Sequence, residues 1–212
     1  MKKLWPRKWK ANNFVQGTTD YEAGYPVSND KEIVTLMGAT GDRSIYPHRG
    51  IDISTVSGTS ITPLLWNDQT KVGFANYNND FLTTEQGRMV GLETPISYMF
   101  KGEMRTDIVL QRYLHLDGQR KVRTDSLIGT PNTILGMSGN SGQWNGEGYK
   151  SHLHVDISTG ITGSPYLDLM ASNYQTKIMS SYYYRDRYYY DPLMFLNDDD
   201  YEIRDNAWGY NY

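Results

Sequence analysis

The stretch YKSHLHVDIS, residues 149–158, places His152, His154 and Asp156 at alternate positions. In an extended strand successive side chains point to opposite faces, so these three residues share one face. The apolar residues between and after them point to the other face and would anchor the strand in a core. The stretch therefore predicts a strand that presents two imidazoles and a carboxylate on one side.

Short segments rich in β-branched and aromatic residues recur from about residue 33 onward, each bounded by Gly, Asn, Asp or Pro. They read EIVTLMG, IDIST, SITPLLW, KVGFANY, RMVGLET, DIVLQRYLHL and TILGMSG. This pattern is typical of an antiparallel β protein. We expect a mainly β fold, an antiparallel β-sheet domain with few short helices. One such helix is expected over 164–175, with Ser164 as its cap.

The composition limits the kinds of partner and of metal site. The chain has 212 residues, a net charge of -3 and both signs of charge interspersed, which argues against a nucleic-acid binder. No run is long and apolar enough for a transmembrane segment. The basic start MKKLWPRKWKANNF has no apolar region after it, so we expect no signal peptide in this chain. Cysteine is absent, so a metal would have to be held by His, Asp or Glu.

A second pair of candidate ligands lies in PHRGIDIS, where Asp52 follows His48 by four residues. Gly50 and the β-branched residues after it oppose a helix and favour a turn that leads into a strand at Ile51. Because glycine has no side chain, the backbone can bend there so that His48 and Asp52 converge.

These two residues and a third ligand, His154, would form a shell suited to Zn²⁺ that leaves the fourth tetrahedral position for water. His152 would then lie beside the metal, close enough to act as a base. The fourth histidine, His115, lies in LQRYLHLDG at the end of another strand-like run. Alternation there predicts that Tyr113, His115 and Asp117 share one face.

Three motifs, taken in order, resemble the lysostaphin-type zinc metallopeptidases, which cut peptide bonds in bacterial peptidoglycan. They are HRGID at 48–52, YLH at 113–115 and HLH at 152–154. Flanking segments agree with this resemblance, namely GDR at 41–43 and the glycine-rich GMSGNSG at 136–142. The order and spacing of three motifs make the resemblance specific.

The resemblance implies a groove that contains one Zn²⁺ per chain, bound by His48, Asp52 and His154. It also implies that His115 and His152 are the catalytic pair that handles the proton and the developing oxyanion. Which of the two is the base and which the stabiliser stays open.

Two other features lie close to these motifs. Asp156 and Asp117 are expected to be structural carboxylates or outer partners of the site. Two inserts, over 78–107 and 142–150, would border the groove and change which wall peptide fits. The tyrosine-rich SYYYRDRYYYDPLMF at 181–195 is expected to form one strand that closes the core, with stacking on sugar rings as the alternative.

We therefore expect three parts: an N-terminal basic and aromatic extension (1–32), a lysostaphin-type metallopeptidase domain (33–196) and a C-terminal tail (197–212). The resemblance implies a zinc-dependent endopeptidase that hydrolyses stem or cross-bridge peptides of peptidoglycan. It would act on the cell wall from outside the cell or as a lysin carried in a phage particle, for example in its tail.

Two alternatives were weighed against this interpretation. The related D-Ala-D-Ala carboxypeptidases also bind zinc through His, Asp and His, but they keep a Glu base close before the last His. Here Ser151, His152 and Leu153 precede His154, which disfavours them. A catalytically silent cell-wall-binding or virion structural module of the same fold is the other alternative. Retention of every motif residue argues against it.

Overall fold

The computed structural model describes residues 7–8, 15–16, 21–27, 32–39, 47–78, 82–144, 146–173, 181–196 and 201–204. Trp5 and Trp9 of the predicted basic and aromatic extension lie outside these residues, whereas Arg7–Lys8 of the same extension lie within them. The GDR segment at 41–43 also lies outside.

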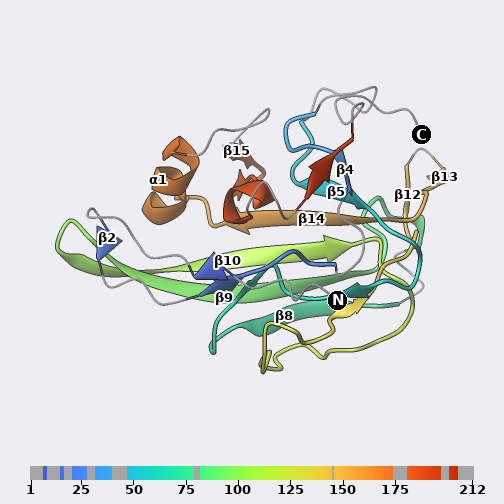
Figure 1. Ribbon diagram of the computed structural model, residues 1–212, viewed down its shortest axis with the longest axis horizontal. Coiled ribbons are helices and arrows are strands. Elements are labelled where there is room, and N and C mark those ends of the chain that lie inside the picture. Colours follow the sequence, from blue (N-terminus) through green and yellow to red (C-terminus); the bar gives the residue numbers. More distant parts are fainter. Residues whose placement is uncertain are drawn as a thin grey trace.

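One mostly antiparallel sheet organises the protein (Figure 1). Its strands follow the order β17 (Glu202–Ile203), β4 (Glu32–Thr35), β5 (Ile51–Ser54), β14 (His152–Thr159), β10 (Glu103–Leu114), β9 (Met89–Phe100) and β2 (Val15–Gln16). In addition, β8 (Lys71–Asn76) pairs with β9, and β16 (Arg187–Tyr190) pairs with both β14 and β15 (Ser181–Tyr184). The pairing of β17 with β4 is parallel, and the other pairs are antiparallel. The predicted mainly β fold is confirmed.

Smaller elements complete the described structure. Short strands form a sheet of β1 (Arg7–Lys8), β3 (Glu22–Ala23) and β7 (Leu65–Trp66), and two further pairs, β6 (Ser60–Ile61) with β11 (Gly136–Met137) and β12 (Gln143–Trp144) with β13 (Glu147–Gly148). Two helices follow β14 in the chain, α1 (Pro165–Asn173) and the 3₁₀ helix η3 (Pro192–Phe195). Within the described ranges, neither helix is long and apolar enough to cross a membrane.

Strand β14 is the centre of the fold, with β10 on one side and β5 and β16 on the other. All of its residues are buried, so both of its faces are covered. Leu153, Val155 and Ile157 have no exposed surface and belong to the main apolar core. The core face of β14 thus holds the strand in place while its other face carries the polar residues.

Helix α1 begins as the sequence predicts. The Ser164 hydroxyl accepts a hydrogen bond from the Leu167 amide at 3.2 Å, which caps the first turn, and Pro165 occupies the first helical position. The described helix reaches Asn173, and the last two residues of the predicted helix, 174–175, lie outside the described residues.

The tyrosine-rich stretch forms a hairpin of two strands, β15 and β16, so the prediction of one strand was wrong. Arg185 and Asp186 have φ values of 47° and 63° and form the turn between the strands. Two consecutive left-handed residues match the twist of a two-residue hairpin turn. The predicted burial holds for Tyr190, which has no exposed surface, whereas Tyr183 is 48% exposed.

The turn that leads into β5 is possible because residue 50 is glycine. A Cβ atom at Gly50 would lie 2.1 Å from the Val155 carbonyl oxygen and 2.8 Å from the Asp156 Cβ. Both atoms belong to β14, so the two backbones approach more closely than any side chain would allow. The predicted turn and the strand that starts at Ile51 are confirmed.

Gly50→Ala should destabilise the metal-free protein by about 1–3 kcal/mol, because the new methyl group meets main-chain atoms that cannot rotate away. The measurement is the free energy of unfolding in urea. Gly160→Ala is the matched control, since Gly160 directly follows β14 and a Cβ there has nothing within 4 Å. Equal stability of the two variants would contradict this account of the turn.

Candidate metal centre and active site

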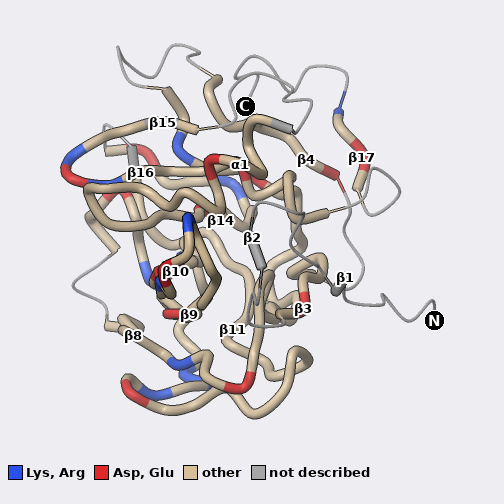
Figure 2. The backbone as a smooth tube through the Cα atoms, turned by 90° about the vertical axis from the view of Figure 1, so that its left-hand side faces the viewer, with Lys and Arg blue, Asp and Glu red and all other residues tan. Residues whose placement is uncertain are grey.

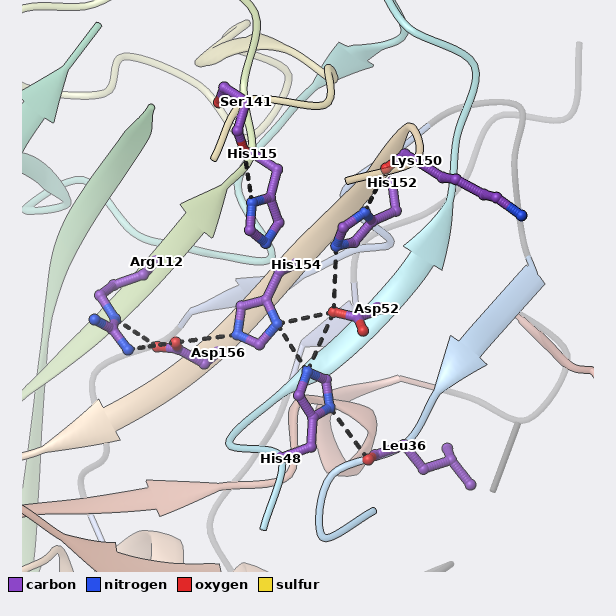
Figure 3. A network of polar contacts seen from close by, with 10 residues as sticks. All are labelled: Leu36, His48, Asp52, Arg112, His115, Ser141, Lys150, His152, His154 and Asp156. Carbon is purple, nitrogen blue, oxygen red and sulfur yellow. Dashed lines mark hydrogen bonds and ion pairs between the residues drawn. The ribbon is translucent and has the colours of Figure 1, made fainter. Parts of the chain in front are cut away.

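Two neighbouring strands bring the predicted ligands together. In the antiparallel register of β5 and β14, Asp52 lies opposite His154. Residues directly opposite each other point to the same face, so both side chains enter the site from the sheet. His48 reaches the same place from the turn before β5, and Figure 3 shows the three side chains converging.

The three donor atoms form a compact triangle. The His48 Nε2 lies 3.0 Å from the His154 Nδ1 and 3.2 Å from the Asp52 Oδ1. The third edge, from the His154 Nδ1 to the Asp52 Oδ1, is 2.9 Å. Donor atoms about 2.0–2.1 Å from a tetrahedral ion lie roughly 3.3 Å from one another, so the triangle needs only a small expansion to become a zinc shell.

In both His48 and His154 the ring nitrogen that points away from the triangle faces a hydrogen-bond acceptor. This contact determines whether the nitrogen that points into the triangle carries a proton or a lone pair. The His48 Nδ1 lies 3.2 Å from the Leu36 carbonyl oxygen, and the His154 Nε2 lies 3.3 Å from the Asp156 Oδ2. Because both acceptors lack protons, the ring nitrogens must be the donors. In their neutral forms both imidazoles therefore direct a lone pair at the centre of the triangle, as does the carboxylate. Three converging lone pairs could hold a metal ion.

Asp156 is itself fixed by Arg112. The guanidinium donates from Nε to Oδ1 at 2.9 Å and from a terminal nitrogen to Oδ2 at 2.6 Å. Burial opposes ionisation of Asp156, but the charge of Arg112 and the hydrogen bonds from Arg112 and His154 hold its pKa well below the usual range. A carboxylate that accepts from the outer nitrogen of a ligating histidine orients the ring and raises its basicity.

The charges at the centre favour a bound cation. Burial works against charge on Asp52, yet His48 and His154 hold its pKa well below the usual range. Burial likewise works against a charged His154, but hydrogen bonds to Asp156 and Asp52 outweigh it and raise its pKa. In the metal-free chain a proton would supply the positive charge, and a metal ion would displace it.

One oxygen at this centre has no hydrogen-bond partner. Among the residues that the structure describes, the buried Asp52 Oδ2 accepts no hydrogen bond. A buried carboxylate oxygen without a donor is costly unless a cation satisfies it. The residues present therefore fit a divalent ion held by two imidazoles and a carboxylate.

The remaining two histidines lie together beside this triangle. The His115 Nδ1 donates to the Ser141 carbonyl oxygen at 2.9 Å, and the His152 Nδ1 donates to the Lys150 carbonyl oxygen at 2.8 Å. The two ring centroids are 4.4 Å apart. The His152 Nε2 lies 3.9 Å from the Asp52 Oδ1, so it faces the same centre.

His115 reaches the site through an unusual backbone conformation. Strand β10 ends at Leu114, which is opposite His154, and His115 then has a φ of 65°. Left-handed backbone in a residue other than glycine is uncommon and concentrates at functional sites. Burial, together with the nearby imidazoles of His152 and His154, lowers the pKa of His115 well below its usual value.

The predicted common face of Tyr113 and His115 was therefore wrong. Tyr113 points into the core, where its hydroxyl accepts from the Leu64 amide at 2.7 Å and donates to the Gln111 side chain at 2.8 Å. Simple alternation would have sent His115 to that core side. The left-handed conformation breaks the alternation and turns the imidazole toward the site.

Asp156 and Asp117 were given the same expected role by the sequence, but they have different surroundings. Asp156 contacts His154 and Arg112, as an outer partner of the site would. The Asp117 carboxylate instead accepts from the Gln119 amide at 2.8 Å in an exposed turn. Asp117 is thus a turn residue.

Tyr149 is a site residue that the sequence interpretation did not name. Its ring is half-buried and lies 4.4 Å from the His115 ring and 5.4 Å from the His152 ring, between centroids. Tyr149 lies three residues before His152 and outside any strand. The alternation of a strand therefore could not predict which way its side chain points. Its position at the start of YKSHLH was the only available signal.

Asp156→Asn should lower the affinity for zinc by about 10–100-fold, because the neutral amide no longer holds His154 as a charged acceptor does. Asp117→Asn is the matched control and should bind zinc as the unmodified chain does. Competition with a chromophoric chelator measures both affinities on protein whose folding is checked by circular dichroism. An unchanged affinity in Asp156→Asn would show that the outer carboxylate does not orient the ligand.

Comparisons with known proteins gave structural likenesses without sequence matches. No family model matches the chain, and no curated protein matches it. The catalytic domain of the antimicrobial peptidase lysostaphin from Staphylococcus simulans is 19% identical, with 66% of this chain and 80% of that chain covered and a TM-score of 0.40. A protein described as a peptidase M23 from Pseudomonas aeruginosa is 15% identical, with 82% and 53% covered and a TM-score of 0.38.

A mutant catalytic domain of the prophage-encoded M23 protein EnpA from Enterococcus faecalis is 18% identical, with 63% of this chain and 84% of that chain covered and a TM-score of 0.39. The family that the motifs resemble is thus also the one found among solved structures. Because identities and TM-scores are this low, the function of the chain has to be inferred from its own side chains.

Proposed function

We propose that the chain is a zinc-dependent endopeptidase that hydrolyses peptide bonds in the stem or cross-bridge peptides of bacterial peptidoglycan. One observation carries the proposal: the lone pairs of His48, Asp52 and His154 converge on one point, and two more imidazoles lie beside this triangle. Two nitrogens and one oxygen leave a tetrahedral ion one open position, which is the arrangement of catalytic zinc sites.

The ligand set favours zinc over other biological metals. Imidazole nitrogen suits zinc and neighbouring transition metals, whereas magnesium and calcium prefer shells of oxygen. When bound, Zn²⁺ supplies Lewis acidity toward the scissile carbonyl and toward the attacking water. The remaining chemistry, which is the movement of protons, falls to the residues of the chain.

His152 is placed to act as the general base. Because its Nδ1–H donates to the Lys150 carbonyl, its Nε2 carries the lone pair and faces the centre of the site. This nitrogen can accept a proton from the attacking water and then donate it to the departing amine. The outer hydrogen bond keeps the proton on Nδ1 in both the neutral and the protonated ring, so the proton that moves is always the one on Nε2.

His115 has the same tautomer as His152, so its Nε2 also carries a lone pair. Its Nδ1–H donates to the Ser141 carbonyl, and its lowered pKa favours the neutral ring, so its Nε2 accepts a proton before it can donate one. As a stabiliser of the oxyanion, His115 would act after it has received a proton. The proposal thus assigns proton handling to the pair and oxyanion stabilisation to its protonated member.

The substrate class is proposed from the order of the motifs HRGID, YLH and HLH, which resembles lysostaphin-type enzymes. Short glycine bridges and D-Ala–diamino acid links are both candidates for the bond that is cut. Action on the wall from outside the cell, including delivery by a phage particle, belongs to the same proposal.

Ligand and base variants should separate metal binding from turnover. His154→Ala and Asp52→Ala should each lose zinc and activity together, because two protein ligands do not hold the ion. His152→Ala should keep about one zinc per chain but turn over about 10²–10⁴-fold more slowly. Zinc content and release of new amino termini from purified cell walls are measured on the same preparations.

Two results would contradict the proposal in different ways. Loss of zinc from His152→Ala would mean that the ligands within HLH are wrongly assigned. If the unmodified chain holds zinc but releases no amine from walls with either type of cross-link, the silent binding module becomes the better interpretation.

A further inference from the structure

The hairpin of β15 and β16 is firmly attached to the domain, yet the proposed reaction does not use it. Tyr190 is fully buried, and its hydroxyl donates to the Asp168 carboxylate and accepts from the Ser164 amide, both at 2.9 Å. Tyr189 is also buried. The base of the hairpin is thus fixed, while its turn, with basic residues on both sides of Asp186, projects at the left edge of Figure 2.

Two guanidinium groups lie on one tyrosine of this hairpin. The Arg49 Cζ is 5.1 Å from the centroid of the Tyr184 ring, and the Arg185 Cζ is 5.0 Å from the same centroid. Arg49 also lies over the Tyr189 ring, at 5.8 Å. Cation–π contacts of this kind position a guanidinium but leave its charge uncompensated. We call these residues, Arg49, Tyr184 and Arg185, the arginine–tyrosine cluster.

The positive charges of the cluster have no carboxylate partner within the described part of the chain. Arg105 also lacks one among these residues, so the distinguishing feature of the cluster is that two guanidinium groups lie over the same ring. Arg112 is paired with Asp156, and Arg204 is paired with Glu32. No such ion pair involves Arg49 or Arg185 among the described residues. Arg49 is half-buried and already held on two rings, so it would lose little conformational freedom on binding an anion.

The cluster is also connected to the metal centre. Arg49 directly follows His48 in the chain. On the sheet, Tyr189 is opposite Ser158, four residues along β14 from His154. At about 3.3 Å per residue that separation is roughly 13 Å along the strand for Tyr189, and Tyr184, which pairs with Arg187, lies further along the hairpin. Arg112, which holds Asp156, lies between Tyr189 and His154 with its Cζ 5.9 Å from the Tyr189 ring.

We propose that the arginine–tyrosine cluster is a substrate subsite that binds a free carboxylate of the peptide, on the side of the metal centre where β16 pairs with β14. The inference rests on the proposed function, since it assigns a specificity to the same active site. Guanidinium groups bind carboxylates through paired N–H donors, and two of them on one ring supply more donors than one carboxylate needs. A wall peptide with a free carboxylate should therefore bind better than the same peptide with that group amidated.

Arg185→Gln tests the subsite without touching the turn that carries His48. The substrates are two wall peptides that differ only in whether the carboxylate is free or amidated. For the free acid the variant should raise KM by about three- to fivefold, as expected for an exposed ion pair, with kcat and zinc content unchanged. For the amidated peptide KM should not change. Arg49→Gln should act in the same direction, with zinc content checked because His48 is adjacent.

Arg105→Gln is the matched control, because the Arg105 Cζ lies 5.0 Å from the Phe100 ring in the same kind of contact at the far end of β10. It should leave KM for both peptides unchanged. The subsite is refuted if Arg185→Gln raises KM equally for both peptides. It is also refuted if Arg185→Gln raises KM for the free acid no more than Arg105→Gln does.

A second readout keeps this test separate from the proposed function. Calorimetric titration of the zinc-loaded chain with each peptide measures binding whether or not cleavage occurs. If the unmodified chain cleaves neither peptide but binds the free acid more tightly, and Arg185→Gln abolishes the difference, the endopeptidase proposal fails and the subsite stands. Equal binding of the two peptides by the unmodified chain refutes the subsite.

Discussion

The register between β5 and β14 is the constraint on which the site depends. It places Asp52 opposite His154, and a slip of one residue would send one of the two side chains to the core face. The apolar residues on the core face of β14 favour this register, because a slip of one residue would move them to the polar face of the site. Gly50 then allows the preceding turn to approach β14 closely enough for His48 to complete the triangle. Core packing and ligand placement are therefore two consequences of one strand alignment.

The charges buried on the site face are tolerated because oppositely charged side chains contact one another in a row that leads away from the metal centre. Arg112 compensates Asp156, and Asp156 orients His154. Removing one member of such a buried pair leaves an uncompensated charge, which costs about 3–5 kcal/mol. Within the described part of the chain, the carboxylate of Asp52 pairs with no arginine and faces the imidazoles of His48 and His154. A divalent cation satisfies this arrangement better than the protons of the metal-free chain can.

Much of the fold and of the candidate ligand set could be predicted because it depends on local patterns. The alternation of polar and apolar residues in HLHVDIS predicted the strand and the direction of its side chains. The glycine in HRGID predicted the turn. The contacts that fix the histidine tautomers could not be predicted, since the acceptors are mostly main-chain carbonyls and any residue type supplies one. The direction of His115 was missed because a single left-handed residue overrides alternation. The partners of Arg49 were missed because the hairpin that carries Tyr184 lies 135 positions further along the chain and meets it only through the sheet.

The central claim is that His48, Asp52 and His154 hold one zinc ion while the other two histidines do not. X-ray absorption at the zinc edge, on protein loaded with one equivalent of zinc, tests it most directly. The account predicts a shell of nitrogen and oxygen at about 2.0–2.1 Å with two imidazoles contributing. Failure to take up zinc, or a shell with three or four imidazoles, would contradict it.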